Sequence, residues 1–78
     1  MDIQLQLCVA NLYGHNKLNT LKNLIDSEEN DLLLKEDPIR HAVSYQIYYG
    51  DPDAKVLALE LASKMKMLSP SEIKELAS

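Results

Sequence analysis

Few residues in this sequence could carry catalytic chemistry: one cysteine, two histidines and an ordinary set of carboxylates. Nucleophilic catalysis requires a nucleophile beside a base that a third group orients. Only Cys8 with His15 or His41 could supply the first two groups. Cys8 falls on the apolar face of an expected helix, where a cysteine usually behaves as a small, inert hydrophobic residue. We therefore expect no catalytic residues and a protein that is not an enzyme.

Metal and phosphate sites also lack their usual patterns. Two histidines and one cysteine without close spacing do not form a zinc site. Residues 26–37 faintly resemble a calcium loop, but Asp31 stands where the loop requires glycine, and Asp37 stands where it requires a bidentate glutamate. Gly14 and Gly50 are isolated, so they form no glycine-rich phosphate loop. We expect no metal site and no cofactor, and we interpret 26–37 as a solvated acidic connection.

The tyrosines are the most informative side chains. The chain has no Phe or Trp, and three of its four tyrosines lie in one expected helix. Together with His41, the three tyrosines occupy positions i, i+4, i+7 and i+8. This course is displaced from the inward face, which consists of Ile39, Ala42, Val43 and Ile47. Either these rings fill the space between helix pairs, or they form a binding hot spot, in which tyrosine is common. On the second hypothesis, the partner-binding residues are His41, Tyr45, Tyr48 and Tyr49.

Proline and glycine divide the C-terminal half of the chain into helices. Asp37, Asp51 and Ser69 each precede a proline, the arrangement of an N-cap followed by the first helical position. Ser69 and Glu72 also match a capping box. These signals predict helices over 38–49, 52–67 and 70–77, with Gly50 in the left-handed position that follows a helix end.

The N-terminal half predicts a helix pair. Four apolar residues share one helical face, Gly14 can end that helix, and Asn16 can cap a second helix that runs to about Asp26. The first helix rests on Leu5, Cys8, Val9 and Leu12. Residues 2–9 also alternate between polar and apolar side chains, which leaves a strand open, although no second strand is available to pair with it. Leucines 32–34 are expected to form a short helix or tight turn and to pack against the core, which would hold the acidic connection 26–37 in place.

Two segments resemble ankyrin repeats. Residues 8–15 (Cys-Val-Ala-Asn-Leu-Tyr-Gly-His) and the leucines that follow resemble the helix–turn–helix core of one repeat. Residues 37–42, then Gly50 and a leucine-rich helix, are similar to the opening of the next. The resemblance covers about 50 residues. It departs from the family at Arg40, which replaces a histidine, in an extra helical turn before Gly50, and in the lack of a Gly-Ala-Asp hairpin. The resemblance implies a protein-binding scaffold.

Length and charge set the remaining expectations. The net charge of −4 and the scattered lysines argue against binding to nucleic acid or to an anionic membrane. A lone cysteine, no long apolar segment and no basic leader favour the cytoplasm. We expect one domain, 1–78, with an all-α fold: a compact bundle of four to five short helices formed by helical hairpins and a C-terminal helix.

We therefore hypothesise a small protein-interaction module, a regulator or adaptor that binds another protein or itself, as a homodimer, through helix 38–49. Two alternatives remain open. One is a nucleic-acid-associated transcriptional regulator, whose lysines would have to converge on one face. The other is an acidic decoy that occupies a basic groove.

Overall fold

Helical spacing decides the structure of the N-terminal segment. In the computed structural model, which describes residues 2–78, Asp2 caps a helix by accepting a hydrogen bond from the Gln4 N–H at 3.1 Å. The helix buries Leu5 and Leu12 on one face. The strand alternative is therefore wrong, because an isolated strand would leave its backbone groups unpaired, whereas a helix pairs them within the segment.

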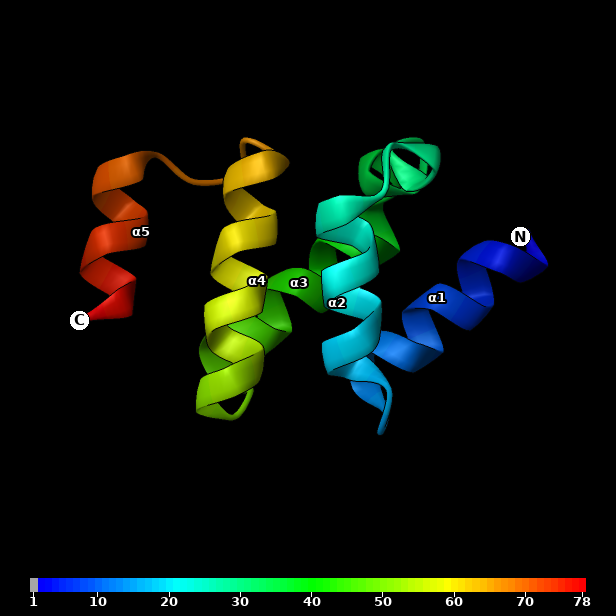
Figure 1. Cartoon of the computed structure of the whole chain (residues 1–78), viewed down its shortest axis with the longest axis horizontal. Helices are drawn as coiled ribbons and strands as arrows, with labels where there is room; N and C mark the ends of the chain where they lie inside the picture. The colour runs from blue at the N-terminus through cyan, green and yellow to red at the C-terminus, as the bar shows by residue number, and fades with distance from the viewer. Residues whose placement is uncertain (1) are drawn as a thin grey trace.

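Residues 2–78 contain helices and no strand, which confirms the all-α prediction. Two 3-10 turns connect the second and third α-helices. The elements are α1 (Ile3–Tyr13), α2 (Lys17–Asp26), η1 (Glu28–Asn30), η2 (Leu33–Lys35), α3 (Asp37–Tyr49), α4 (Pro52–Lys64) and α5 (Pro70–Ala77) (Figure 1).

The first four α-helices form two hairpins that pack side by side. α1 contacts α2 and α3, while α4 contacts both α2 and α3. In Figure 1, α2 and α4 run next to each other and α3 passes behind them. α5 stands at the end of the molecule and packs on α4. The result is a compact helical bundle measuring 36 × 23 × 19 Å.

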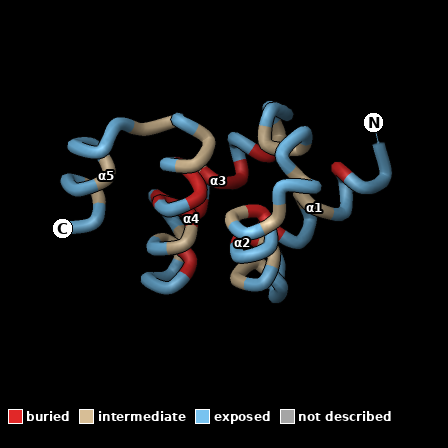
Figure 2. The backbone as a smooth tube through the Cα atoms, turned by 45° about the horizontal axis from the view of Figure 1, so that its top comes forward, coloured by how far each residue is buried: buried red, intermediate tan, exposed pale blue. Residues whose placement is uncertain are grey.

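The core is built from aliphatic side chains. Figure 2 shows the buried positions along the facing sides of the helices. α4 contributes three alanines at four-residue spacing, and such small side chains let neighbouring helices approach closely. The buried hydrophobic residues are Leu5, Leu12, Leu21, Leu24, Ile39, Ala42, Val43, Ile47, Ala54, Ala58, Leu59, Leu61 and Ala62.

Two of the three expected caps form. The Asp51 carboxylate accepts a hydrogen bond from the Ala54 N–H at 2.9 Å, and Ser69 with Glu72 forms the complete capping box. The expected cap at Asp37 is wrong, because the helix starts one residue earlier than expected. The Glu36 carbonyl already accepts hydrogen bonds from the Ile39 and Arg40 N–H groups, which leaves Asp37 inside the first turn. Asn16 precedes α2 but makes no side-chain capping bond.

The helix ends differ from expectation. Gly50 has φ −75°, so its predicted left-handed conformation is wrong. The reason for glycine there is space, since a Cβ would collide with the side-chain and backbone oxygens of Gln46. α4 ends at Lys64 rather than near Met67, because Lys66 adopts a left-handed conformation with φ 60°. The Lys66 and Met67 N–H groups then bond back to the Ser63 and Ala62 carbonyls, a Schellman motif.

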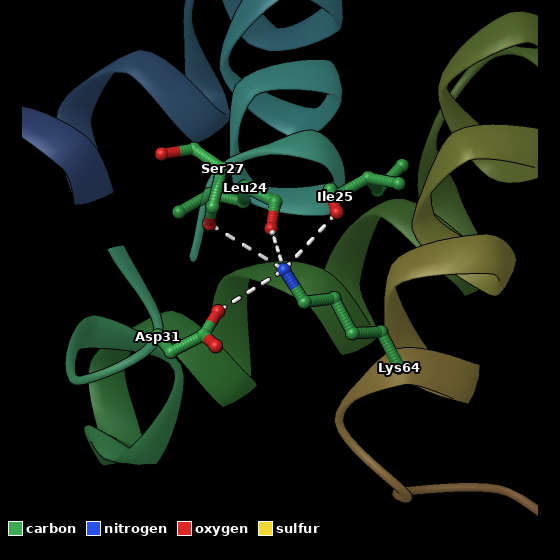
Figure 3. Close-up of polar contacts among 5 residues, drawn as sticks. All are labelled: Leu24, Ile25, Ser27, Asp31 and Lys64. Carbon is green, nitrogen blue, oxygen red and sulfur yellow. Dashed lines mark hydrogen bonds and ion pairs between the residues drawn. The ribbon is translucent and has the colours of Figure 1, made fainter. Parts of the chain in front are cut away.

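The acidic connection is held by leucines and by one lysine. Leu33 and Leu34 pack against the core as expected, but Leu32 is 75% exposed, which corrects the prediction for that residue. The Lys64 ammonium of α4 donates to the carbonyls of Leu24 and Ile25 at 2.8 and 3.0 Å and forms an ion pair with Asp31 at 3.1 Å (Figure 3). A cation at a helix C-terminus complements the helix dipole. Lys64 therefore fixes both the end of α2 and the connection.

Candidate interaction surface

α3 separates its apolar and aromatic residues onto opposite sides. The expected inward residues Ile39, Ala42, Val43 and Ile47 are all buried, together with Gln46. The outward side carries His41, Tyr45, Tyr48 and Tyr49, all of which are exposed. The four residues predicted for partner binding therefore share one side of a helix that the core holds in place.

The tyrosine rings lie at the surface of the molecule and not in its hydrophobic core. The four tyrosines are between 45% and 76% exposed, and Tyr49 is the most exposed. The interpretation of the rings as filler between the helix pairs is therefore wrong for Tyr48 and Tyr49, whereas Tyr13 of α1 and Tyr45 of α3 do meet across the two pairs. Within residues 2–78 the buried hydrophobic core consists of Leu, Ile, Val and Ala side chains and contains no aromatic ring.

Three tyrosines form a continuous row of rings. The Tyr13 and Tyr45 ring centroids lie 5.2 Å apart at an interplanar angle of 66°, an edge-to-face arrangement. Tyr45 and Tyr49 are also 5.2 Å apart, with their planes inclined at 39°. Such ring pairs add about 0.5–1.5 kcal/mol beyond the apolar area they bury. The row joins the end of α1 to the middle and end of α3.

Tyr13 was not among the predicted site residues. Its only sequence signal is its position just before Gly14, which places it at the end of α1. The contact with Tyr45 depends on the packing of α1 against α3, which no local pattern records. We define the tyrosine surface as Tyr13, His41, Tyr45, Tyr48 and Tyr49.

His41 borders a shallow polar depression beside α3. The depression has a volume of about 310 Å³ and is lined by Asp37, Arg40, His41, Ser44 and Met67. Within residues 2–78, neither His41 nor Tyr48 joins the ring contacts made by the other three tyrosines. The tyrosine surface thus combines a row of contacting aromatic rings with a polar depression at His41, which one acid and one arginine also line.

The cysteine lies in a poor setting for nucleophilic chemistry. Cys8 is half-buried on α1 and packs against the hydrophobic core, on the apolar face where the sequence placed it. Burial raises the pKa of its thiol above the ordinary value of 9.0. A protonated thiol is a weak nucleophile, and the groove beside Cys8 contains no histidine.

Comparisons and whole-chain features add no candidate site. No cluster of three or more His, Cys, Asp or Glu side chains suited to a metal ion occurs in residues 2–78. None of the helices described for these residues has the length and apolar character needed to cross a bilayer. No protein-family model matches the chain, and neither a curated protein nor a solved structure is significantly similar to it. The resemblance to ankyrin repeats remains a likeness of short segments.

Proposed function

We propose that the protein is a small, non-enzymatic interaction module, a regulator or adaptor, and that it binds another protein or a second copy of itself through the tyrosine surface. One observation carries the proposal: the core is entirely aliphatic, while all four tyrosines are exposed. Aromatic side chains are usually a major part of the buried area of a domain. Here they are available for burial against a partner.

The geometry supports this use of the rings. A tyrosine has few rotatable bonds, so its burial in an interface costs little conformational entropy, and its hydroxyl can remain hydrogen-bonded. Tyr13 and Tyr49 restrict the Tyr45 ring from both sides. A partly pre-ordered ring loses less freedom on binding than an isolated one. A cytoplasmic location fits the single cysteine, which has no second thiol in the chain to pair with.

Ion pairs on the surface disfavour the two alternative functions, a nucleic-acid-associated regulator and an acidic decoy. Lys17 lies 3.0 Å from Asp51, and Lys64 is bound by α2 carbonyls and Asp31. These two lysines are therefore already partly neutralised, and fewer cations remain for a phosphate backbone. The same ion pairs partly neutralise Asp51 and Asp31, so an acidic decoy would have less negative charge to present to a basic groove. A mobility-shift assay at low salt that showed salt-dependent DNA binding at micromolar protein would favour the nucleic-acid alternative instead.

A paired substitution tests the proposed function. Changing Tyr45 and Tyr48 to Ser removes two exposed rings and should leave the helical circular-dichroism signal intact. In a pull-down from native cells, followed by mass spectrometry, the variant is expected to lose the specific partner. Light scattering tests self-association in parallel. Val56→Ser, which removes an exposed apolar side chain from α4, is the matched control and should retain partner capture. Equal capture by the tyrosine variant and wild type would refute the proposal.

A further inference from the structure

A second concave feature lies between α1 and α2, away from the tyrosine surface. Nine residues line a groove of about 230 Å³, and none of them carries a charge, although 26% of the chain is charged. None of the nine belongs to the tyrosine surface. Leu24 is buried beneath the groove, Leu33 and Cys8 are half-buried in its walls, and Leu7 stands at its edge, 60% exposed.

Four carboxamide side chains surround this apolar floor. α1 supplies Gln4 and Asn11, α2 supplies Asn23, and η1 supplies Asn30. Within residues 2–78, none of these four side chains has an intramolecular hydrogen bond. Each carboxamide offers both donors and an acceptor. The groove therefore presents paired donors and acceptors from both of its sides, with no fixed charge.

The uncharged lining and the free carboxamides of the groove favour an extended peptide as its ligand. A carboxamide can bond simultaneously to an N–H and a C=O group, and an extended peptide leaves both groups of its backbone free. A helical ligand already pairs these groups internally. Ligand pockets usually enclose about 300–1,000 Å³. The smaller volume here suits one apolar side chain, with the following side chain pointing away as in any extended strand.

We propose that the groove between α1 and α2 binds an uncharged, extended peptide segment of a partner protein. The backbone of that segment would bond to Gln4, Asn11, Asn23 and Asn30, and one of its aliphatic side chains would rest on Leu24. A charged peptide would lose hydration without gaining an ionic partner in the groove. This site is separate from the tyrosine surface, so either proposal can fail without the other.

A displayed library of random linear peptides, selected on the immobilised full chain, tests the inference. The expected ligands are uncharged sequences with an aliphatic residue. Changing both Asn11 and Asn23 to Asp should raise the Kd of a selected peptide by about tenfold or more. Asn19→Asp makes the same chemical change on an exposed part of α2 outside the groove and should change the Kd less than about twofold.

A second readout uses the only thiol in the chain. Bound peptide should slow alkylation of Cys8 by iodoacetamide, because Cys8 lines the groove. The Tyr45→Ser, Tyr48→Ser variant should bind the peptide as wild type does. The inference is overturned if selection yields no binder, if the binders are charged, or if the Asn11, Asn23 variant binds normally. Loss of binding in the tyrosine variant alone would place the peptide on the tyrosine surface and would also overturn it.

Discussion

At the residue scale, Gln46 and Gly50 depend on each other. Gln46 is 3% exposed, and its Nε2 donates to the Leu12 carbonyl at 2.7 Å, which ties α3 to the end of α1. Its Oε1 is buried and has no hydrogen-bond partner within residues 2–78. Leaving a buried acceptor unpaired costs about 1–3 kcal/mol. Because Gly50 has no Cβ, the Gln46 side chain can take this position.

Replacing Gly50 with alanine should destabilise the fold. The new Cβ would collide with the Oε1 and the carbonyl oxygen of Gln46, one of which belongs to the backbone and cannot move alone. We expect a loss of about 1–3 kcal/mol in the free energy of unfolding, measured by urea denaturation. Gly14→Ala is the control, since its Cβ would meet only the Ala10 carbonyl, at 3.2 Å. Equal effects of the two substitutions would contradict the steric explanation.

The cap at Asp51 should make stability depend on pH. The hydrogen bond from the Ala54 N–H, and then the bond to Lys17, lower the pKa of Asp51 below its ordinary value of 3.8. The ionised cap therefore stabilises the folded state above about pH 4, and its contribution is lost as the pH falls through the lowered folded-state pKa.

Asp51→Ala is the variant that tests this dependence. Its melting temperature should lie below that of wild type at pH 7, and the gap should narrow as the pH is lowered from about 4 toward 2 and the wild-type carboxyl takes up its proton. Asp51→Asn keeps a neutral cap and should fall between the two at pH 7. A gap of constant size across this pH range would show that the charge has no role.

At the element scale, local sequence signals predicted the helices but not the contacts between them. Ser69 and Asp51 could be recognised as caps because a cap acts within three residues along the chain. Nothing local marks Lys66 as left-handed, since that conformation usually selects glycine. The Tyr13–Tyr45 contact and the bonds of Lys64 to α2 link residues more than thirty positions apart. Sequence periodicity thus predicted the outward side of α3 but not the whole tyrosine surface.

Removing the Lys64 ammonium should loosen the end of α2. In Lys64→Met the carbonyls of Leu24 and Ile25 lose their charged donor, while most of the aliphatic stem is kept. The lysine side chain is 27% exposed, so solvent screening reduces the effect, and we expect a loss of about 1–2 kcal/mol. Hydrogen exchange should accelerate selectively in the last turn of α2.

Asp31→Asn separates the two parts of this interaction. It removes the ion pair at 3.1 Å but leaves the carbonyl bonds, and its effect should be about 0–1 kcal/mol. A larger loss in Asp31→Asn than in Lys64→Met would show that the ion pair, and not the capping of α2, is the main interaction.

The end of α4 offers a stabilising change. Lys66 occupies the left-handed position of the Schellman motif, where a side chain costs about 1–2 kcal/mol relative to the right-handed conformation. Lys66→Gly removes this cost but gives the unfolded chain more freedom, so a net gain of about 0.5–1 kcal/mol is expected in chemical denaturation. Lys74→Gly, inside α5, should instead destabilise by up to about 1 kcal/mol. A loss of stability in Lys66→Gly would contradict the strain assigned to this residue.

At the scale of the whole molecule, the two hairpins and α5 contribute unequally to the fold. All of the buried hydrophobic residues belong to α1–α4, and the contacts of α4 with α2 and α3 are the most extensive in the fold. α5 has no buried residue and places only Ile73 and Leu76 partly against the core. In Figures 1 and 2 it stands at one end of the molecule, next to α4.

A chain ending at Leu68, without residues 69–78, should therefore still fold. The loss of two half-buried side chains is expected to cost about 1–2 kcal/mol, and thermal unfolding followed by circular dichroism should remain cooperative. Because the tyrosine surface lies on α1 and α3, partner capture should also survive this truncation. Removal of residues 1–13 is the opposite case, since it takes away Leu5, Leu12 and the carbonyl that pairs with Gln46. The chain without residues 1–13 should therefore lose cooperative unfolding. If the chain 1–68 also lost cooperative unfolding, α5 would be an essential part of the bundle.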